Sequence, residues 1–217
     1  FSIAHVSREP RLKNYYDAAE SSGGAVPQFQ QNSDGTYNFD NPLVKPEKML
    51  SLDLGINYKN DFNDFGLNFY FMQFNDEIIS NGQLDRFGQP ITGNMNKTMH
   101  YGIEISAVSK PYSFIELIGN ININKNYISD GFTYIEDPST GNIVKQDLTD
   151  NLIGGFPNIL LNAAINFNYE NLSIQLSGKY LGKFYSDNYY NKLNEYLQKY
   201  ADFVDYSDNV VDPYFIA

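Results

Sequence analysis

The stretch NILLNAAINFNYENLSIQLSGKYLGKF, residues 158–184, decides the fold. Apolar side chains occupy every second position in each half, and the dipeptide Glu170–Asn171 separates the halves. Because successive side chains of a β-strand point to opposite faces, the pattern predicts two strands, each with one apolar and one polar face. The apolar set comprises Ile159, Leu161, Ala163, Ile165, Phe167, Leu172, Ile174, Leu176, Tyr180 and Phe184.

The same alternation recurs along the chain and predicts an all-β, antiparallel protein of about eight strands. The longer runs extend over roughly eleven to fourteen residues, whereas strands of soluble proteins usually have about five or six. At about 3.3 Å per residue and a tilt near 45°, twelve residues rise about 28 Å, the height of the apolar band of an outer-membrane barrel. The remaining predicted strands span residues 1–7, 48–59, 66–79, 99–109, 114–127 and 213–217.

The connections between these runs alternate in length. Short turns at Asn60–Phe65, Lys110–Ser113 and Glu170–Asn171 alternate with long polar segments at 8–45, 80–97, 129–156 and 186–212. This rhythm is typical of a transmembrane β-barrel with short periplasmic turns and long extracellular loops. The apolar face would then touch lipid and the polar face would line a wet lumen. The alternative is a soluble β-protein whose polar side chains face water.

Aromatic residues near the strand ends predict two interfacial girdles. By the short turns these are Tyr58, Phe65, Tyr112, Phe167 and Tyr169, and toward the long segments they are Phe74, Tyr101, Tyr127 and Phe184.

Composition excludes several functions. With 26 acidic and 15 basic residues, the net charge of −11 argues against nucleic-acid binding. The absence of Cys removes disulfides, thiolate nucleophiles and Cys-ligated zinc, and two His leave little for acid–base chemistry. No apolar stretch is long enough for a membrane-spanning helix, and no familiar catalytic motif is present. We therefore expect no enzyme and no cofactor.

The long segments carry acidic residues, which we interpret as solvated surface; divalent-cation binding is the less favoured alternative, because no spacing resembles an EF-hand. The sequences NSDGT at 32–36 and DPSTGN at 137–142 predict hairpins within the loops. In the last segment the apolar period changes to three and four, which predicts a helix over 190–201, with a disordered acidic loop as the alternative. Its stripe is Tyr190, Leu193, Leu197, Tyr200 and Val204.

No residue is assigned to a catalytic, cofactor or metal site. Met95, Met99 and His100 could offer soft ligands to copper, but Met99 and His100 would point to opposite faces of a strand. Glu104 and Glu116 are expected to face the lumen within a hydrogen-bond network. His5 is expected to be structural.

An ordered series of short motifs resembles the C-terminal half of the barrel of TonB-dependent outer-membrane receptors. The series covers nearly the whole chain, and each piece is weak by itself. It comprises SREPRLKNYYDA at 7–18, LVKPEKMLSLDLGINYK at 43–59, LNFYFMQFNDEII at 67–79, Tyr101-Gly102-Ile103-Glu104, Gly182-Lys183 through Asp187-Asn188, and Asp212-Pro213-Tyr214. Pro10 and Pro46 fit strand ends because proline cannot donate to a sheet ladder. Arg8 and Glu9 are expected to form a local ion pair at that rim.

The resemblance implies that residues 1–217 are a partial barrel, with the plug domain and the final strands outside this chain. The parent would be a receptor of the Gram-negative outer membrane, embedded in its lipid. It would take up a scarce ligand, such as a ferric siderophore, cobalamin or haem, with energy from the TonB complex acting through the missing N-terminal region. Alternatives are a passive porin or a barrel adhesin; a lipid-modifying barrel enzyme is disfavoured because no nucleophile constellation is present.

Overall fold

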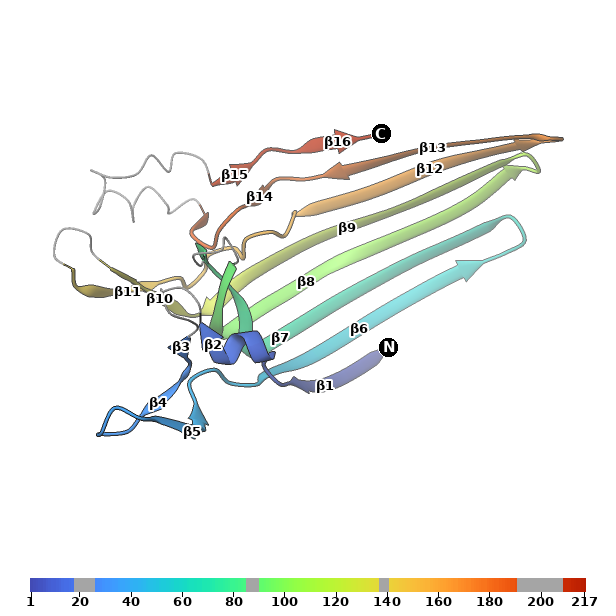
Figure 1. Cartoon of the computed structure of the whole chain (residues 1–217). Helices are drawn as coiled ribbons and strands as arrows, with labels where there is room; N and C mark the ends of the chain where they lie inside the picture. The colour runs from blue at the N-terminus through green and yellow to red at the C-terminus, as the bar shows by residue number, and fades with distance from the viewer. Residues whose placement is uncertain (18–25, 85–89, 137–140, 191–208) are drawn as a thin grey trace.

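The computed structural model describes residues 1–17, 26–84, 90–136, 141–190 and 209–217. Its main feature is one antiparallel sheet of eight strands in the order β1-β6-β7-β8-β9-β12-β13-β16, with β1 and β16 at the edges (Figure 1). The strands are β1 (Ser2–Arg8), β6 (Glu47–Lys59), β7 (Asn63–Leu84), β8 (Pro90–Tyr112), β9 (Ile115–Asp130), β12 (Ile159–Tyr169), β13 (Leu172–Leu181) and β16 (Tyr214–Ile216). In the described residues no helix has the length and apolar character needed to cross a membrane.

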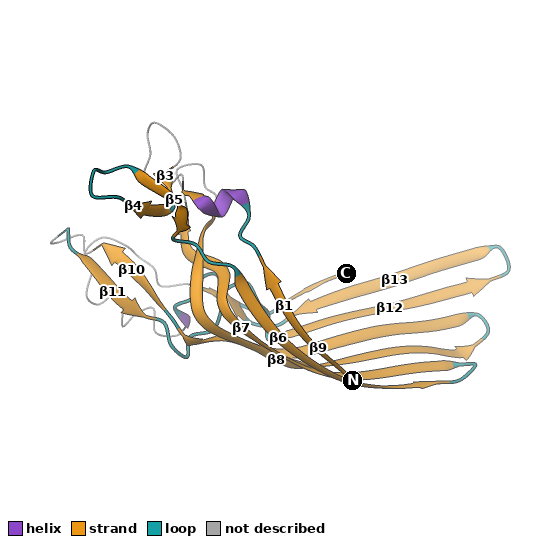
Figure 2. Ribbon diagram, turned by 90° about the horizontal axis from the view of Figure 1, so that it is seen from below, coloured by secondary structure: helices purple, strands orange, loops and turns teal. Residues whose placement is uncertain are grey.

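All the short turns lie at one end of the sheet, here the turn end, and the longer connections lie at the other, the loop end (Figure 2). The predicted placement of short turns and longer connections at opposite ends is therefore confirmed, although most of the segment 80–97 is paired strand. The loop end carries a 3₁₀ helix η1 (Leu12–Tyr15) and four two-stranded pairs. These pairs are β2 (Tyr16–Asp17) with β3 (Val26–Pro27), β4 (Phe29–Gln31) with β5 (Tyr37–Pro42), β10 (Phe132–Glu136) with β11 (Ile143–Asp147), and β14 (Phe184–Tyr185) with β15 (Val210–Val211).

The register confirms the predicted faces. Leu54 lies opposite Phe69, and Phe69 lies opposite Ile103, so these apolar side chains share what we call the outer face. On the other face, here the inner face, Asn68 lies opposite Glu104. A shift of one residue would exchange the two faces, so the alternating sequence fixes this register.

Aromatic side chains gather at the turn end as predicted. Phe114 stacks on Tyr112 with ring centroids 5.5 Å apart and contacts the edges of Phe167 and Tyr169. Toward the loop end, Tyr101 and Tyr127 pack edge to face on the outer face with centroids 6.3 Å apart.

Two members of the predicted loop-end girdle are placed differently. Phe74 lies opposite Thr98, on the same face as His100, and its ring packs against His100 with centroids 5.3 Å apart. Phe184 lies beyond the main sheet, in the pair that β14 forms with β15. The prediction for these two residues was wrong because proximity to a strand end does not say which face a side chain occupies.

The segment 80–97 was predicted as a long loop, but β7 and β8 continue through most of it as paired strands. Pairing of this kind satisfies backbone N–H and C=O groups where the chain leaves the apolar band. Asp76 has a φ of +56°, and at this point the ladder passes from Asn75↔Lys97 to Glu77↔Met95. The local irregularity hides the strand from a search for strict alternation.

The two hairpins predicted inside the loops are confirmed. β4 and β5 flank the turn at 32–36, where Gly35 has a φ of +84° and Thr36 donates both its N–H and its hydroxyl to Asp34. These bonds from Thr36 lower the pKa of Asp34, which is a loop residue. β10 pairs with β11 around the second turn sequence. The helix predicted over 190–201 falls outside the described residues apart from Tyr190.

The prediction that Arg8 pairs with Glu9 was wrong, because Arg8 pairs with Glu47 instead. Arg8 Nε lies 2.8 Å from Oε1 of Glu47, its direct neighbour across the ladder between β1 and β6. The other oxygen of Glu47 accepts the backbone N–H of Ile78 at 3.2 Å. Antiparallel pairing brings the two side chains onto one face, whereas adjacent residues of a strand point to opposite faces.

The buried core lies at the loop end. It joins Ile79 and Met95 at the top of β7 and β8 to Ile128 of β9 and to Leu148 and Ile153 of the following segment. Asn188 ties the next connection to this core, because its side chain accepts the N–H of Gly154 and donates to the carbonyl of Ser80. The loop end is therefore a packed platform on the sheet.

Candidate functional site

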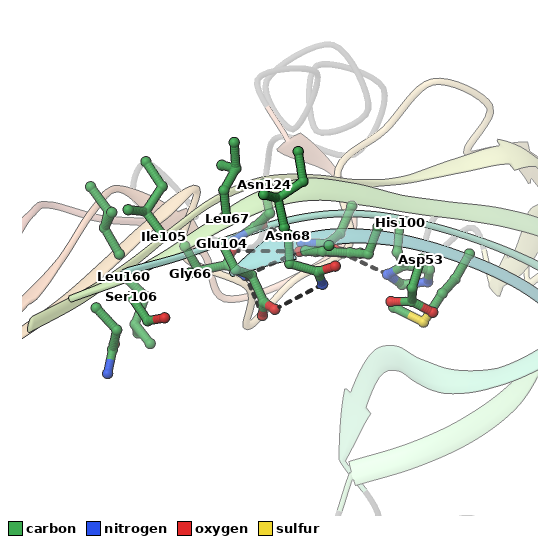
Figure 3. Close-up of a pocket in the computed structure, with 18 of the residues that line it drawn as sticks. Asp53, Gly66, Leu67, Asn68, His100, Glu104, Ile105, Ser106, Asn124 and Leu160 are labelled. Carbon is green, nitrogen blue, oxygen red and sulfur yellow. Dashed lines mark hydrogen bonds between the residues drawn. The ribbon is translucent and has the colours of Figure 1, made fainter. Parts of the chain in front are cut away.

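The inner face of the sheet lines an open hollow of about 940 Å³, which is the candidate site (Figure 3). Side chains from five neighbouring strands, β6 to β9 and β12, line it because every second residue of each strand points to this face. Phe156 and Pro157, which precede β12, also line it.

A chain of hydrogen bonds runs along the wall of this hollow. Asn126 donates to Asn124 at 2.5 Å, and Asn124 donates to Asn122 at 2.6 Å. Asn122 in turn donates to Glu104 at 3.1 Å, and Asn68 donates to the other oxygen of Glu104 at 3.3 Å. The asparagines stand at every second position of β9, so the alternation that the sequence shows is what aligns them.

His100 continues this chain toward the loop end. Its side chain is buried, and Nδ1 lies 2.8 Å from Asn126 Oδ1 while Nε2 lies 3.0 Å from Glu77 Oε2. The hydroxyl of Thr98 also donates to Glu77. The rings of Phe74 and Phe156 pack edge-on against the imidazole. Both ring nitrogens therefore have protein partners, so neither nitrogen is directed at a ligand.

Met95, Met99 and His100, which were considered as copper ligands, do not point to a common site. Met99 lies opposite Gln73 on the outer face, whereas His100 lies on the inner face. Met95 is 3% exposed and belongs to the loop-end core. Within the described residues no group of three or more His, Asp or Glu side chains is arranged to hold a metal ion.

Glu104 and Glu116 both lie on the inner face, as predicted, but they are far from each other along the strands. Glu104 lies opposite Asn122, whereas Glu116 lies near the turn end opposite Asn166. Glu116 accepts from Asn166 Nδ2 at 2.9 Å and forms an ion pair with Lys110 at 3.3 Å. Both carboxylates thus belong to hydrogen-bond networks, as predicted. His5 is exposed on the outer face, opposite Leu50 of β6.

Sequence reasoning missed the contact between Glu77 and His100. Glu77 follows Asp76, whose positive φ interrupts the alternation of β7. A count of odd and even positions therefore could not place the Glu77 side chain. The partly buried hydrogen bonds between Tyr70 and Asn122 were also missed, since Tyr70 lay in the least regular run.

The wall is suited to contact with a polar solute or a polar protein surface. Its amide side chains can each donate and accept hydrogen bonds. They are bonded to one another and to the carboxylate of Glu104 at distances of 2.5 to 3.1 Å, so the wall is preorganised.

Comparison with protein families decides what kind of barrel this sheet belongs to. The model described as "TonB dependent receptor-like, beta-barrel" matches residues 1–216. The chain belongs to this family. It is therefore part of the antiparallel transmembrane barrel of a Gram-negative outer-membrane protein, and the soluble alternative is excluded.

Solved receptor structures share the fold of this TonB-dependent receptor barrel. The ferric yersiniabactin uptake receptor FyuA from Yersinia pestis has a TM-score of 0.59 at 13% identity, with 98% of this chain and 25% of that chain covered. The copper transporter OprC has a TM-score of 0.57 at 14% identity, with 85% and 24% covered. The ferric enterobactin receptor PfeA from Pseudomonas aeruginosa, in complex with BCV-L6, has a TM-score of 0.56 at 17% identity, with 98% and 29% covered.

The barrel segment described here thus spans about a quarter of the length of these solved structures. At such low identities the likeness concerns the fold alone. No curated protein gives a significant match to the sequence.

Proposed function

We propose that this chain is part of an active-transport receptor that takes up a scarce ligand with energy relayed by TonB. The single observation that carries the proposal is the family match over residues 1–216. Residues 1–217 would supply part of the barrel, and the plug and the remaining strands would come from other parts of the same protein. The loop end would face the cell exterior, and the energy-coupling complex would act through an N-terminal region.

The proposed ligand class is a ferric siderophore, cobalamin or haem. The named relatives support metal-linked cargo, since two of them are described as receptors for ferric siderophores and one as a copper transporter. The hollow, at about 940 Å³, has room for a ligand of this size. Its amide-rich wall, which also carries the carboxylate of Glu104, would let a large polar ligand exchange hydrogen bonds as it moves.

The proposal is tested with the complete receptor in a Gram-negative host that lacks its own receptors for these ligands. Uptake is measured with a panel of iron-labelled siderophores, cobalamin and haem, with TonB present or deleted. We expect saturable uptake of at least one probe, and its loss when TonB is deleted. Uptake that continues without TonB and rises linearly with concentration would indicate a passive porin. Cell attachment without uptake of any probe would indicate an adhesin.

Phe156 offers a sharper test of the ligand path. Its ring lines the hollow and is 48% exposed, so it can contact a ligand entering from the loop end. Phe156→Ala should weaken the apparent affinity for the transported probe by roughly 5- to 100-fold, the loss of one buried aromatic contact. Phe62→Ala is the matched control, because Phe62 is 65% exposed at the turn end. Equal effects of the two changes would contradict this path.

A further inference from the structure

Three lysines lie on the lipid-facing side of the sheet at the loop end. Lys48 of β6 and Lys97 of β8 stand in one register row, because both lie opposite Asn75 of β7. The next row toward the turn end holds Leu50 and Met99, so the two lysines follow directly on the apolar band. They are two strands apart, or about 10 Å.

Lys125 of β9 completes this outer lysine group. It lies opposite Tyr101, on the outer face and two rows nearer the middle of the strands than Lys97. Its Nζ lies 4.8 Å from the ring centroid of Tyr127, which is two residues closer to the loop end. The long side chain thus leans away from the apolar band, as a lysine does when its ammonium seeks the polar side of a membrane boundary.

Lysines at the turn end are arranged differently. Lys59 forms an ion pair with Asp64 at 2.9 Å, and Lys110 forms one with Glu116 at 3.3 Å. Lys179 lies farther from the turns, near the loop-side end of β13, but on the inner face opposite Asn162. In the strands that the structure describes, the outward positions near the turns carry apolar or uncharged side chains. On the outer face, the lysines are therefore confined to the loop-end side of the apolar band.

Few acidic side chains in the described part of the protein neutralise the charges of the outer lysine group. Within the described residues none of the three lysines forms an ion pair. Asp130 is the acidic neighbour, since it lies opposite Lys97, and it accepts a hydrogen bond from Asn96 at 3.2 Å. The outer lysine group thus carries three positive charges, and the carboxylate of its acidic neighbour is bonded to Asn96.

We propose that the outer lysine group binds the phosphate groups of anionic lipids in the leaflet at the loop end. A lysine ammonium just outside the apolar band lies at the depth of the lipid head groups. The phosphate of an anionic lipid has no positive charge of its own beside it, so it can pair with the ammonium. The inference depends on the outer-membrane location of the barrel and not on the transported ligand. Lysines near an anionic surface favour it by roughly fivefold each.

The test measures which lipid gathers beside the group. Ser7 lies opposite Lys48 on the outer face of β1, so a fluorophore on Ser7→Cys reports on this boundary in a complete receptor with no other cysteine. The receptor is placed in bilayers of phosphatidylglycerol and phosphatidylcholine, one of which carries bromine on its acyl chains. Quenching by each brominated lipid gives their relative local binding.

We expect phosphatidylglycerol to be favoured by roughly 5-fold or more, and at most on the order of 100-fold, at low salt, and the preference to fall on adding NaCl. The triple variant Lys48→Gln, Lys97→Gln, Lys125→Gln should lose most of this preference. The matched control Lys59→Gln, Lys110→Gln, Lys179→Gln removes the same charge from the inner face and should keep it. Retained heat-modifiable migration on gels shows that each variant has folded.

Two outcomes would overturn the proposal. One is an unchanged lipid preference in the folded outer triple variant. The other is an equal loss in the inner control, which would mean that net charge and not position attracts the lipid. A native receptor without any preference for phosphatidylglycerol contradicts it as well.

Discussion

At the loop end Ile128 and Leu148 are 0% and 1% exposed, whereas Ile103 and Ile123 in the middle of the same sheet are 36% and 46% exposed. The loop end buries its apolar groups within this chain, against segments that return over the strand tops. The middle of the sheet has no such cover, and lipid provides it instead. One sheet therefore has two kinds of stabilisation, which different changes should affect separately.

The largest expected effect comes from taking the middle region out of the membrane. The isolated chain of 217 residues would expose its outer face and the free edges β1 and β16 to water. Such surfaces associate, so the isolated chain should form no stable water-soluble monomer. Analytical ultracentrifugation with and without detergent measures this. A monodisperse, cooperatively melting monomer in plain buffer would contradict the comparison.

A smaller but strong effect is expected for the loop-end core. Leu148→Ala should destabilise the platform by about 2–5 kcal/mol, because the neighbours cannot fill the cavity completely. Hydrogen exchange in the complete receptor should then rise over residues 143–153. Leu43→Ala is the control, since Leu43 is 55% exposed at the same end and should change exchange little. Equal protection in both variants would show that the core is not cooperative.

Charges placed on the two faces of the middle region should have unequal effects. A lysine at Ile103 or Ile121 of the outer face should cost about 2–4 kcal/mol near the bilayer midplane, and the same should hold at Leu161, which lies opposite Ile121. Lysine at Asn120 or Asn162, which face inward and hydrogen-bond each other at 2.8 Å, should cost much less. Denaturant unfolding of the receptor in liposomes measures the difference. Equal tolerance would reject the assignment of the faces.

Most of the sheet could be predicted from the sequence because one face is apolar and the other polar. In β12 and β13 that difference alone determines face and register. It failed at Phe74, an apolar ring on the inner face, and at Glu77, which follows the positive φ of Asp76. The loop-end core was also not predicted, since Ile79, Ile128 and Leu148 come from segments far apart in sequence, and no local period links them.

The smallest effect distinguishes the ion pairs at the two ends. Glu47 is 7% exposed and receives both Arg8 and the N–H of Ile78, whereas Lys59 and Asp64 form a pair in contact with solvent at the turn end. Glu47→Gln keeps an acceptor for Ile78 but loses the charge opposite Arg8. It should cost about 1 kcal/mol, less than the roughly 1.5–3 kcal/mol of hydrogen bonds to charged groups, because Arg8 is itself half exposed. Exchange of the Ile78 amide in the complete receptor reports this loss directly. Asp64→Asn should leave exchange at the turn end unchanged, because exposed pairs contribute little. A larger response at Asp64 than at Glu47 would mean that burial does not separate the two ends in the way their exposures indicate.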